Sequence, residues 1–186
     1  MRRSWPIWIT ALVGALLTVG CGSEMSDFES KRVSTALEDS MLSTTESWDV
    51  DMNMLENEVR IVRLRAPYSA SYEIGADTET RFEGPVSIQI FDTSGTISTS
   101  VSCMQALYRA RSSEFEFSGN VIVETDEGKK LRSEFLEWFQ KTGTIQSDKY
   151  VIITAPGDSI AGYGLTGTED LSEYTIKNVS GRVELN

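Results

Sequence analysis

Carboxylates are the most numerous side chains in this sequence that could do acid–base chemistry, because the chain contains no histidine. The missing imidazole removes the commonest general base, the Ser-His-Asp and Cys-His arrangements, and the usual catalytic zinc site. A carboxylate pair such as Glu134 and Glu137 could divide the acid and nucleophile roles of a glycosidase. With 28 acidic residues, however, such pairs are expected by chance. We therefore predict that the protein is not an enzyme and needs no cofactor.

Two further motifs resemble ligand sites only in part. Asp49, Asp51 and Asn53 alternate like the first ligands of a calcium loop, but the required glycine is missing and Arg60 stands at position twelve. We interpret them as the solvated face of a strand. The segment Gly162-Tyr163-Gly164 has no helix signal after it, so it is not a phosphate-binding loop. A bulge or a close backbone approach explains it better, and we predict no metal site.

The amino terminus is typical of an export signal. Arg2 and Arg3 precede an apolar stretch over residues 7–19, with small residues before Cys21. A spanning anchor is the alternative, but it needs about 20 apolar residues. The rest of a twin-arginine motif is also missing. Leu17-Thr18-Val19-Gly20-Cys21 resembles the lipobox of bacterial lipoproteins, in which the cysteine receives a diacylglyceryl group. We therefore expect a signal peptide over residues 1–20 and a lipid-anchored mature chain beginning at Cys21, held by several acyl chains.

Charge and composition constrain the mature chain. Loss of Arg2 and Arg3 takes the formal charge from −11 to about −13. Such an acidic protein is not expected to bind nucleic acid, and it would repel anionic lipid head groups, leaving acyl chains as the part to hold. Residues 21–46 are rich in Ser, Thr and acidic residues and are interpreted as a tether, although a short helix over residues 28–42 remains open. Cys103 would be the one cysteine left, expected to be a small buried hydrophobe with no disulfide.

From Trp48 onward the apolar residues alternate with polar ones, as in strands that have one apolar face. The clearest runs are Trp48, Val50, Met52 and Met54; Phe82, Val86, Ile88 and Ile90; and Phe115, Phe117, Val121 and Val123. Turn signals separate the runs at Asp92-Thr93-Ser94-Gly95, Asp126-Glu127-Gly128, Lys141-Thr142-Gly143 and Pro156-Gly157-Asp158. The pattern predicts an all-β sandwich or open roll, with a helix over residues 131–140 as the one rival.

An internal repeat of about thirty residues favours strands there too. A 2-3-2 spacing recurs in Val101, Cys103, Ala106, Tyr108; in Leu131, Ser133, Leu136, Trp138; and in Ile160, Gly162, Leu165, Gly167. The companion strands keep step, with Phe115, Phe117, Val121 and Val123 followed by Ile145, Ser147, Val151 and Ile153. Tyr174, Ile176, Val183 and Leu185 close the last unit, and a fainter first unit begins at Leu64 and Ala66. The three-residue step predicts a bulge inside each 2-3-2 motif, which would bend the strand and curl the stacked hairpins around a shared interior.

The apolar interior of such a roll has two possible uses. It can close into a dry core, or it can hold a long apolar ligand. The pattern alone leaves both open. A lipoprotein β-sandwich that binds carbohydrate or protein through surface loops is therefore the alternative to a lipid carrier.

The order of several short motifs resembles the LptC family. They run from Phe82-Glu83-Gly84-Pro85-Val86 and Asp92-Thr93-Ser94-Gly95 through Gly119-Asn120-Val121-Ile122-Val123 and Gly128-Lys129-Lys130-Leu131-Arg132-Ser133-Glu134 to Ile145-Gln146-Ser147-Asp148, Ile160-Ala161-Gly162-Tyr163-Gly164-Leu165 and Tyr174-Thr175-Ile176-Lys177-Asn178-Val179-Ser180-Gly181. The resemblance covers most of residues 59–185 and is weak before Trp48. It implies a twisted open antiparallel β-jellyroll over residues 47–186, and a non-catalytic role in lipopolysaccharide export at the periplasmic face of the inner membrane.

The resemblance also implies partners and site residues. The partners are lipopolysaccharide acyl chains, the inner-membrane export permease and its ATPase, and a soluble periplasmic bridge protein of similar fold. Many LptC proteins use a transmembrane helix, whereas this chain is expected to use lipidated Cys21. The expected lipid-binding interior comprises Val86, Ile88, Ile90, Val101, Phe115, Phe117, Val121, Val123, Val151, Ile153 and Ile176. The expected partner edges are Trp48, Val50 and Met52 on the transporter side, and Val179, Val183 and Leu185 on the bridge side.

Overall fold

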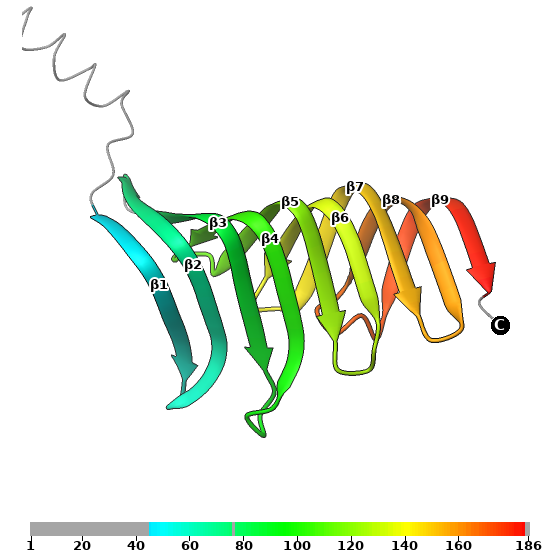
Figure 1. Cartoon of the computed structure of the whole chain (residues 1–186), viewed down its shortest axis with the longest axis horizontal. Helices are drawn as coiled ribbons and strands as arrows, with labels where there is room; N and C mark the ends of the chain where they lie inside the picture. The colour runs from blue at the N-terminus through cyan, green and yellow to red at the C-terminus, as the bar shows by residue number, and fades with distance from the viewer. Residues whose placement is uncertain (1–44, 76, 185–186) are drawn as a thin grey trace, which may run out of the picture. The chain divides into compact units, whose positions relative to one another are not determined.

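The computed structural model describes residues 45–75 and 77–184, which form one antiparallel β-sheet. The strands follow each other in chain order, β1 to β9, so every neighbouring pair is a hairpin (Figure 1). They are β1 (Thr45–Glu56), β2 (Val59–Ile74), β3 (Asp77–Phe91), β4 (Ile97–Arg109), β5 (Glu114–Thr125), β6 (Lys130–Phe139), β7 (Thr144–Ala155), β8 (Asp158–Thr168) and β9 (Tyr174–Glu184). The sheet is open, with β1 and β9 at its two edges, and the predicted all-β fold is confirmed.

The predicted turns fall between the strands. Asp92–Gly95 joins β3 to β4, and Pro156-Gly157 is the two-residue loop between β7 and β8. Gly157 has a φ of 82°, which glycine adopts without steric cost. The rival helix over residues 131–140 is not formed, because strand β6 covers this segment. No helix capable of crossing a membrane occurs in the part of the chain that the structure describes.

A line of bulges crosses the sheet from β2 to β9. The strand register shifts between Arg65 and Tyr68, Glu83 and Val86, Ser102 and Gln105, Ser118 and Val121, Ser133 and Glu137, Ser147 and Tyr150, and Ala161 and Gly162. The shifts in β4 and β6 overlap the three-residue step of the repeat, and the β7–β8 pairing shifts between Tyr163 and Leu165, inside the same step, so the bulges predicted there are confirmed. The shifts in β2, β3, β5 and β7 and the β8–β9 shift beside Gly162 were not predicted. Because a bulge bends its strand, a bulge in successive strands bends the whole sheet along one line.

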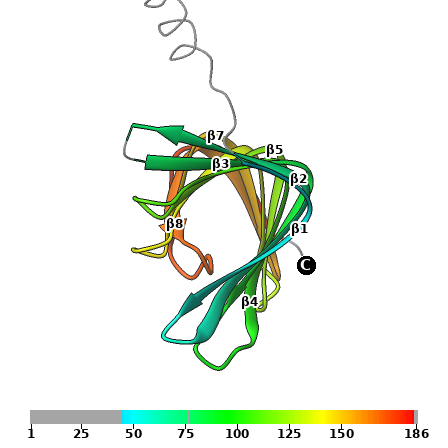
Figure 2. The ribbon, with the colours of Figure 1, turned by 90° about the vertical axis from the view of Figure 1, so that its left-hand side faces the viewer.

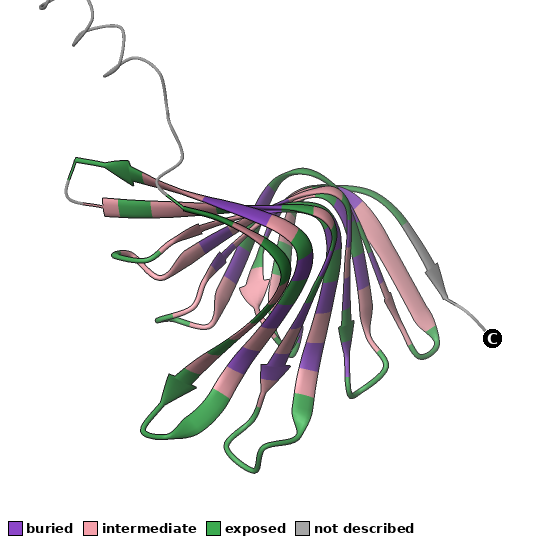
Figure 3. Cartoon of the chain, turned by 60° about the vertical axis from the view of Figure 1, so that its left-hand side comes forward, coloured by how far each residue is buried: buried purple, intermediate pink, exposed green. Residues whose placement is uncertain are grey.

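The bend brings the two halves of each strand to face each other as two layers (Figure 2). Layer A ends at the turns β2–β3, β4–β5, β6–β7 and β8–β9, and layer B ends at the turns β1–β2, β3–β4, β5–β6 and β7–β8. The side opposite the bend, where these two rows of turns lie, is here called the mouth. Figure 3 shows the buried residues within the strands, away from the turns, which are mostly exposed.

Small polar side chains occupy the inside of the bend. Ser133 and Ser147 are buried, and their hydroxyls bond to backbone carbonyls beside the bulges. Ser147 Oγ donates to the carbonyl of Phe135 at 2.6 Å, and Ser133 Oγ donates to that of Tyr150 at 3.1 Å. Cys103 holds the place of Ser133 in its own repeat unit, and it is buried as expected. Burial raises the pKa of its thiol to about 12.

The edge strand β1 differs from the predicted alternation at Trp48. Val50, Met52 and Met54 pack against the core, as expected, but Trp48 is 67% exposed and packs on Tyr68 with ring centroids 5.7 Å apart. The backbone of Asp49 has a φ of 52°, which breaks the alternation between Trp48 and Val50. The prediction that Trp48 shares their face was therefore wrong.

Candidate functional site

The residues predicted to form the lipid-binding interior lie together in one apolar core. Those with relative exposures from 0% to 6% are Val86, Ile88, Ile90, Val101, Phe115, Phe117, Val121, Val123, Val151 and Ile153. Ile176 is partly buried against the same core. The two layers thus pack tightly over most of the sheet, and contact of these residues with lipid stays a prediction.

A cleft of about 570 Å³ separates the layers at the mouth near the amino-terminal edge. Of the predicted interior residues, only Ile90 lines it. Its other walls are Met54, Leu55, Glu56, Ile61, Val62, Phe91, Tyr108, Ser113, Trp138, Gln140, Lys141 and Glu169. The cleft therefore joins the ends of β1, β2 and β3 in layer B to the turns of layer A.

Two aromatic residues, Tyr108 and Trp138, line the layer A wall of the cleft, and both stack on the buried ring of Phe115 behind it. The centroid of Phe115 lies 4.5 Å from that of Tyr108 and 5.2 Å from that of Trp138. Tyr108 and Trp138 hold the same place in successive repeat units, and that shared place was the sequence signal that could have identified this wall. Aromatic side chains contribute large apolar areas, so Tyr108 and Trp138 make this wall partly apolar.

Glu169 lines the cleft and is its one lining residue from the β8–β9 loop. It begins the loop of residues 169–173 between β8 and β9, and its carboxylate accepts a 2.6 Å hydrogen bond from the Trp138 indole. Burial raises the pKa of Glu169, while the bond from Trp138 opposes this shift. Glu169 was not predicted as a site residue, because its partner Trp138 is 31 residues away in the chain and no local pattern links the two.

The predicted partner edges are the edge strands of the sheet. Trp48, Val50 and Met52 lie on β1, and Val179 lies on β9 with 56% of its surface exposed. Val183 belongs to β9, but the structure does not describe its side chain. Leu185 and Cys21 lie outside the described residues altogether. Contact with partners at these edges stays a prediction.

The acidic motifs lie on the outer surface. Glu134 is exposed on β6, and Glu137 is half-buried, with a pKa raised by burial and by the charge of Glu116. Asp51 pairs with Arg63 and Arg65, and the Arg63 guanidinium lowers its pKa to about 2. Within residues 45–184, leaving out residue 76, no three acidic or cysteine side chains are grouped to hold a metal ion.

An open sheet that curls around an apolar interior, with a cleft at its mouth, defines a β-jellyroll of the kind expected to hold an apolar ligand. The family described as "Lipopolysaccharide-assembly, LptC-related" matches residues 10–184. The match covers nearly the whole chain, so the chain belongs to the LptC family. The family supports a role in lipopolysaccharide transport and is periplasmic and associated with the inner membrane. A comparison with curated proteins gave no match.

Proposed function

We propose that this protein is a non-catalytic relay that holds lipopolysaccharide by its acyl chains between the two layers of the curled sheet. The observation that carries the proposal is the cleft of about 570 Å³ whose apolar walls include Met54, Ile61 and Tyr108. Acyl chains gain free energy when they leave water for such walls. Since the protein is strongly acidic, the acyl chains are the favourable part of an anionic lipid to bind.

Photo-crosslinking in cells tests this proposal. A photo-reactive amino acid at Ile61 or Ile90, both of which line the cleft, should capture lipopolysaccharide. Gln89 is the matched control, because it neighbours Ile90 on β3 but belongs to the other face of the strand. Labelling at Gln89 that equals labelling at Ile90 would contradict the proposal.

The two open edges support a place in a chain of similar proteins. Edge strands leave backbone N–H and C=O groups unpaired, and another strand can add to them. In this proposal β1 meets the inner-membrane permease and ATPase complex, and β9 meets the soluble bridge protein. A photo-crosslinker at Val50 should capture a permease subunit and one at Val179 the bridge protein; the reverse outcome would contradict the assignment.

The membrane attachment belongs to the same proposal. We propose that Cys21 is lipidated and holds the protein at the periplasmic face of the inner membrane. The variant Cys21→Ser should leave the membrane fraction. Retention in that fraction would favour the spanning anchor over a lipid.

A second candidate is a lipoprotein that binds carbohydrate or protein through its loops and keeps a dry interior. The tight packing of core residues such as Phe117 and Val121, at 1% and 0% exposure, favours this alternative. It predicts no lipid labelling at Ile61 or Ile90, together with loss of function when turn residues such as Asp126 are changed.

A further inference from the structure

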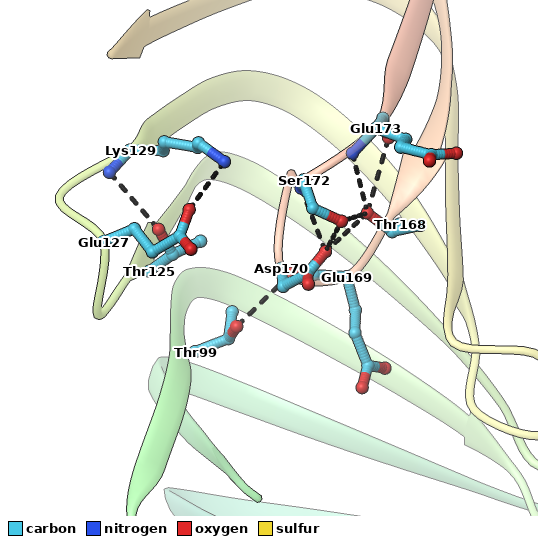
Figure 4. Close-up of polar contacts among 9 residues, drawn as sticks. All are labelled: Thr99, Thr125, Glu127, Lys129, Thr168, Glu169, Asp170, Ser172 and Glu173. Carbon is cyan, nitrogen blue, oxygen red and sulfur yellow. Dashed lines mark hydrogen bonds and ion pairs between the residues drawn. The ribbon is translucent and has the colours of Figure 1, made fainter. Parts of the chain in front are cut away.

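The β8–β9 loop, residues 169–173, crosses the mouth from layer A to layer B and is here called the strap. Thr99, at the mouth end of β4 in layer B, donates from Oγ1 to the carbonyl of Glu169 at 3.3 Å. The amide of Glu169 donates to the Gly143 carbonyl at 2.9 Å, and its carboxylate accepts from Trp138. Figure 4 shows the strap beside Thr99 and the β5–β6 turn, although Thr99 and Glu169 are 70 residues apart.

Leu171 anchors the strap in the interior. Its side chain has 0% exposure and belongs to the apolar core, although it lies in a turn between two exposed residues, Asp170 and Ser172. Its φ of 56° is a conformation that a branched side chain adopts at a steric cost. Burial of the isobutyl group offsets that cost, so the strap is held down chiefly by one apolar side chain.

The strap keeps its shape through bonds of its own. Asp170 accepts from the amide and the hydroxyl of Ser172 at 2.9 and 2.7 Å, and from the hydroxyl of Thr168. The amide of Thr168 donates to the carbonyl of Glu173 at 2.9 Å, which closes the loop at its base. Because these bonds lie within the loop, the strap can leave the mouth as a unit by losing only its contacts to Thr99, Gly143, Trp138 and the core.

A glycine makes room for the strap. Gly167 stands where Tyr108 and Trp138 stand in the two preceding repeat units. A Cβ atom at Gly167 would lie 2.8 Å from the Glu173 carbonyl oxygen, closer than real Cβ contacts. The third unit therefore gives up the aromatic ring of the cleft wall, and the base of the strap occupies that space.

We propose that the strap is a gate: Leu171 fills the place that an acyl chain would take between the cleft and the carboxy-terminal end, and lipid passes only when the strap swings out. This inference rests on the proposed function. Glu169 is the last residue in chain order that lines the cleft, and beyond it Leu171 and the partly buried Ile176 pack into the core. A separate hollow of about 640 Å³ lies at the base of the strap, lined by residues of the strap and of β7, β8 and β9 such as Thr168 and Tyr174, and it shares no lining residue with the cleft. The gate thus decides whether lipid that has entered at β1–β3 reaches β9.

A chemical bridge across the mouth tests the gate. Lys129 and Ser172 are suitable cysteine positions, because Lys129 lies at the β5–β6 turn and Ser172 lies in the strap (Figure 4). The two are near each other: the pKa of Lys129 is raised chiefly by Glu127 and further by the charge of Asp170, which is in the strap. The full chain with Lys129→Cys and Ser172→Cys is joined by a short bis-maleimide and mixed with purified lipopolysaccharide. A photo-reactive amino acid at Ile90 or Ile176 reports lipid before or beyond the strap. Buried Cys103 should not react.

Bridging should leave labelling at Ile90 unchanged and lower labelling at Ile176 at least fivefold. Each single-cysteine variant, treated with the same reagent, is the control for modification elsewhere. Labelling of Ile176 that is as strong as that of Ile90 both with and without the bridge would overturn the gate and leave the proposed function intact. Absence of labelling at Ile90 in the unbridged protein would instead overturn the proposed function, and the gate with it.

A variant that opens the strap covers the case in which the free protein keeps it closed. Leu171→Asn retains a residue that tolerates positive φ but removes the apolar anchor. Labelling at Ile176 should rise severalfold, whereas the same change at exposed Ile74 should have no effect. Protection of the Cys103 thiol shows that each variant is folded. A folded Leu171→Asn protein with unchanged labelling at Ile176 would also overturn the gate.

Discussion

The two ends of the curled sheet use the same repeat to different effect. Toward β1 the layers stand apart at the mouth, and the half-buried side chains Met54, Ile61 and Tyr108 surround a cleft. Toward β9 the layers are joined by the strap, with Leu171 fully buried between them. An open sheet can therefore leave its layers apart at one end and join them at the other while its strands keep one antiparallel pairing pattern.

Removal of the strap's anchor should give the largest effect on stability. Leu171→Ala deletes a fully buried side chain, so we expect the free energy of unfolding to fall by about 2–5 kcal/mol. Met54→Ala, in the cleft wall, should cost about 1 kcal/mol or less, because Met54 is partly exposed. Urea titrations followed by tryptophan fluorescence measure both values. Equal costs would remove the contrast between the two ends.

The close packing of the carboxy-terminal end can be tested at two glycines. A Cβ atom at Gly162 would lie 2.3 Å from the carbonyl oxygen of Asn178, whereas one at Gly181 would meet nothing within 4 Å. Gly162→Ala should therefore destabilise the protein by about 1–3 kcal/mol through overpacking. Gly181→Ala is the matched control and should change the unfolding free energy by less than about 0.5 kcal/mol. A tolerated Gly162→Ala would show that β8 and β9 separate easily.

A smaller effect is expected from the bond between Thr99 and the strap. Thr99→Val keeps the shape of the side chain and removes the donor to Glu169, which should cost about 0.5–1.5 kcal/mol. Ser98→Ala removes a bond of equal length, 3.3 Å, to the carbonyl of Ile90, which is not part of the strap. Hydrogen exchange at the Glu169 amide should speed up in Thr99→Val and not in Ser98→Ala. Similar exchange in both variants would mean that Thr99 does not hold the strap.

The smallest effect concerns pH. Burial raises the pKa of Glu169 in the folded protein, so the folded state binds its proton more tightly than the unfolded state does. The stability from the protonated carboxyl is fully present below the unfolded pKa and is lost as pH rises through the raised folded pKa. Exchange at the Glu169 amide should speed up across that window. In Glu169→Gln, which keeps an acceptor for Trp138, the dependence should disappear; its persistence would exclude Glu169 as the cause.

Much of the fold could be predicted because its signals are local. Alternation of apolar and polar residues identified the strands, and short segments that contain glycine, such as Asp92–Gly95 and Pro156-Gly157, identified the turns. The three-residue step identified the bulges in β4 and β6. The face of Trp48 was predicted wrongly because Asp49 has a positive φ. Aspartate adopts this conformation only at some positions, and nothing in the neighbouring residues indicates that it does so here.

The cleft and the strap could not be predicted in the same way. Both depend on contacts between residues that are far apart in the chain, such as Thr99 with Glu169, and spacing within one strand carries no information about them. Asp170-Leu171-Ser172 has the composition of an ordinary polar turn, and a single leucine in it does not indicate a buried anchor. The sequence shows that Gly167 stands where the other repeat units have an aromatic residue. The reason is seen only in the structure, where the Glu173 carbonyl leaves no room for a side chain at this position.

The line of bulges affects how far the two layers of the sheet can separate. Each strand from β2 to β9 bends at its own register shift, where the ladder bonds are already interrupted. The angle between the halves of each strand can therefore increase without breaking the pairing on either side. Buried hydroxyls such as those of Ser133 and Ser147 keep bonding to backbone carbonyls at the apex. The two layers can thus separate by bending at the bulges, so under the proposed function we expect the width of the interior to adapt to the number of acyl chains bound.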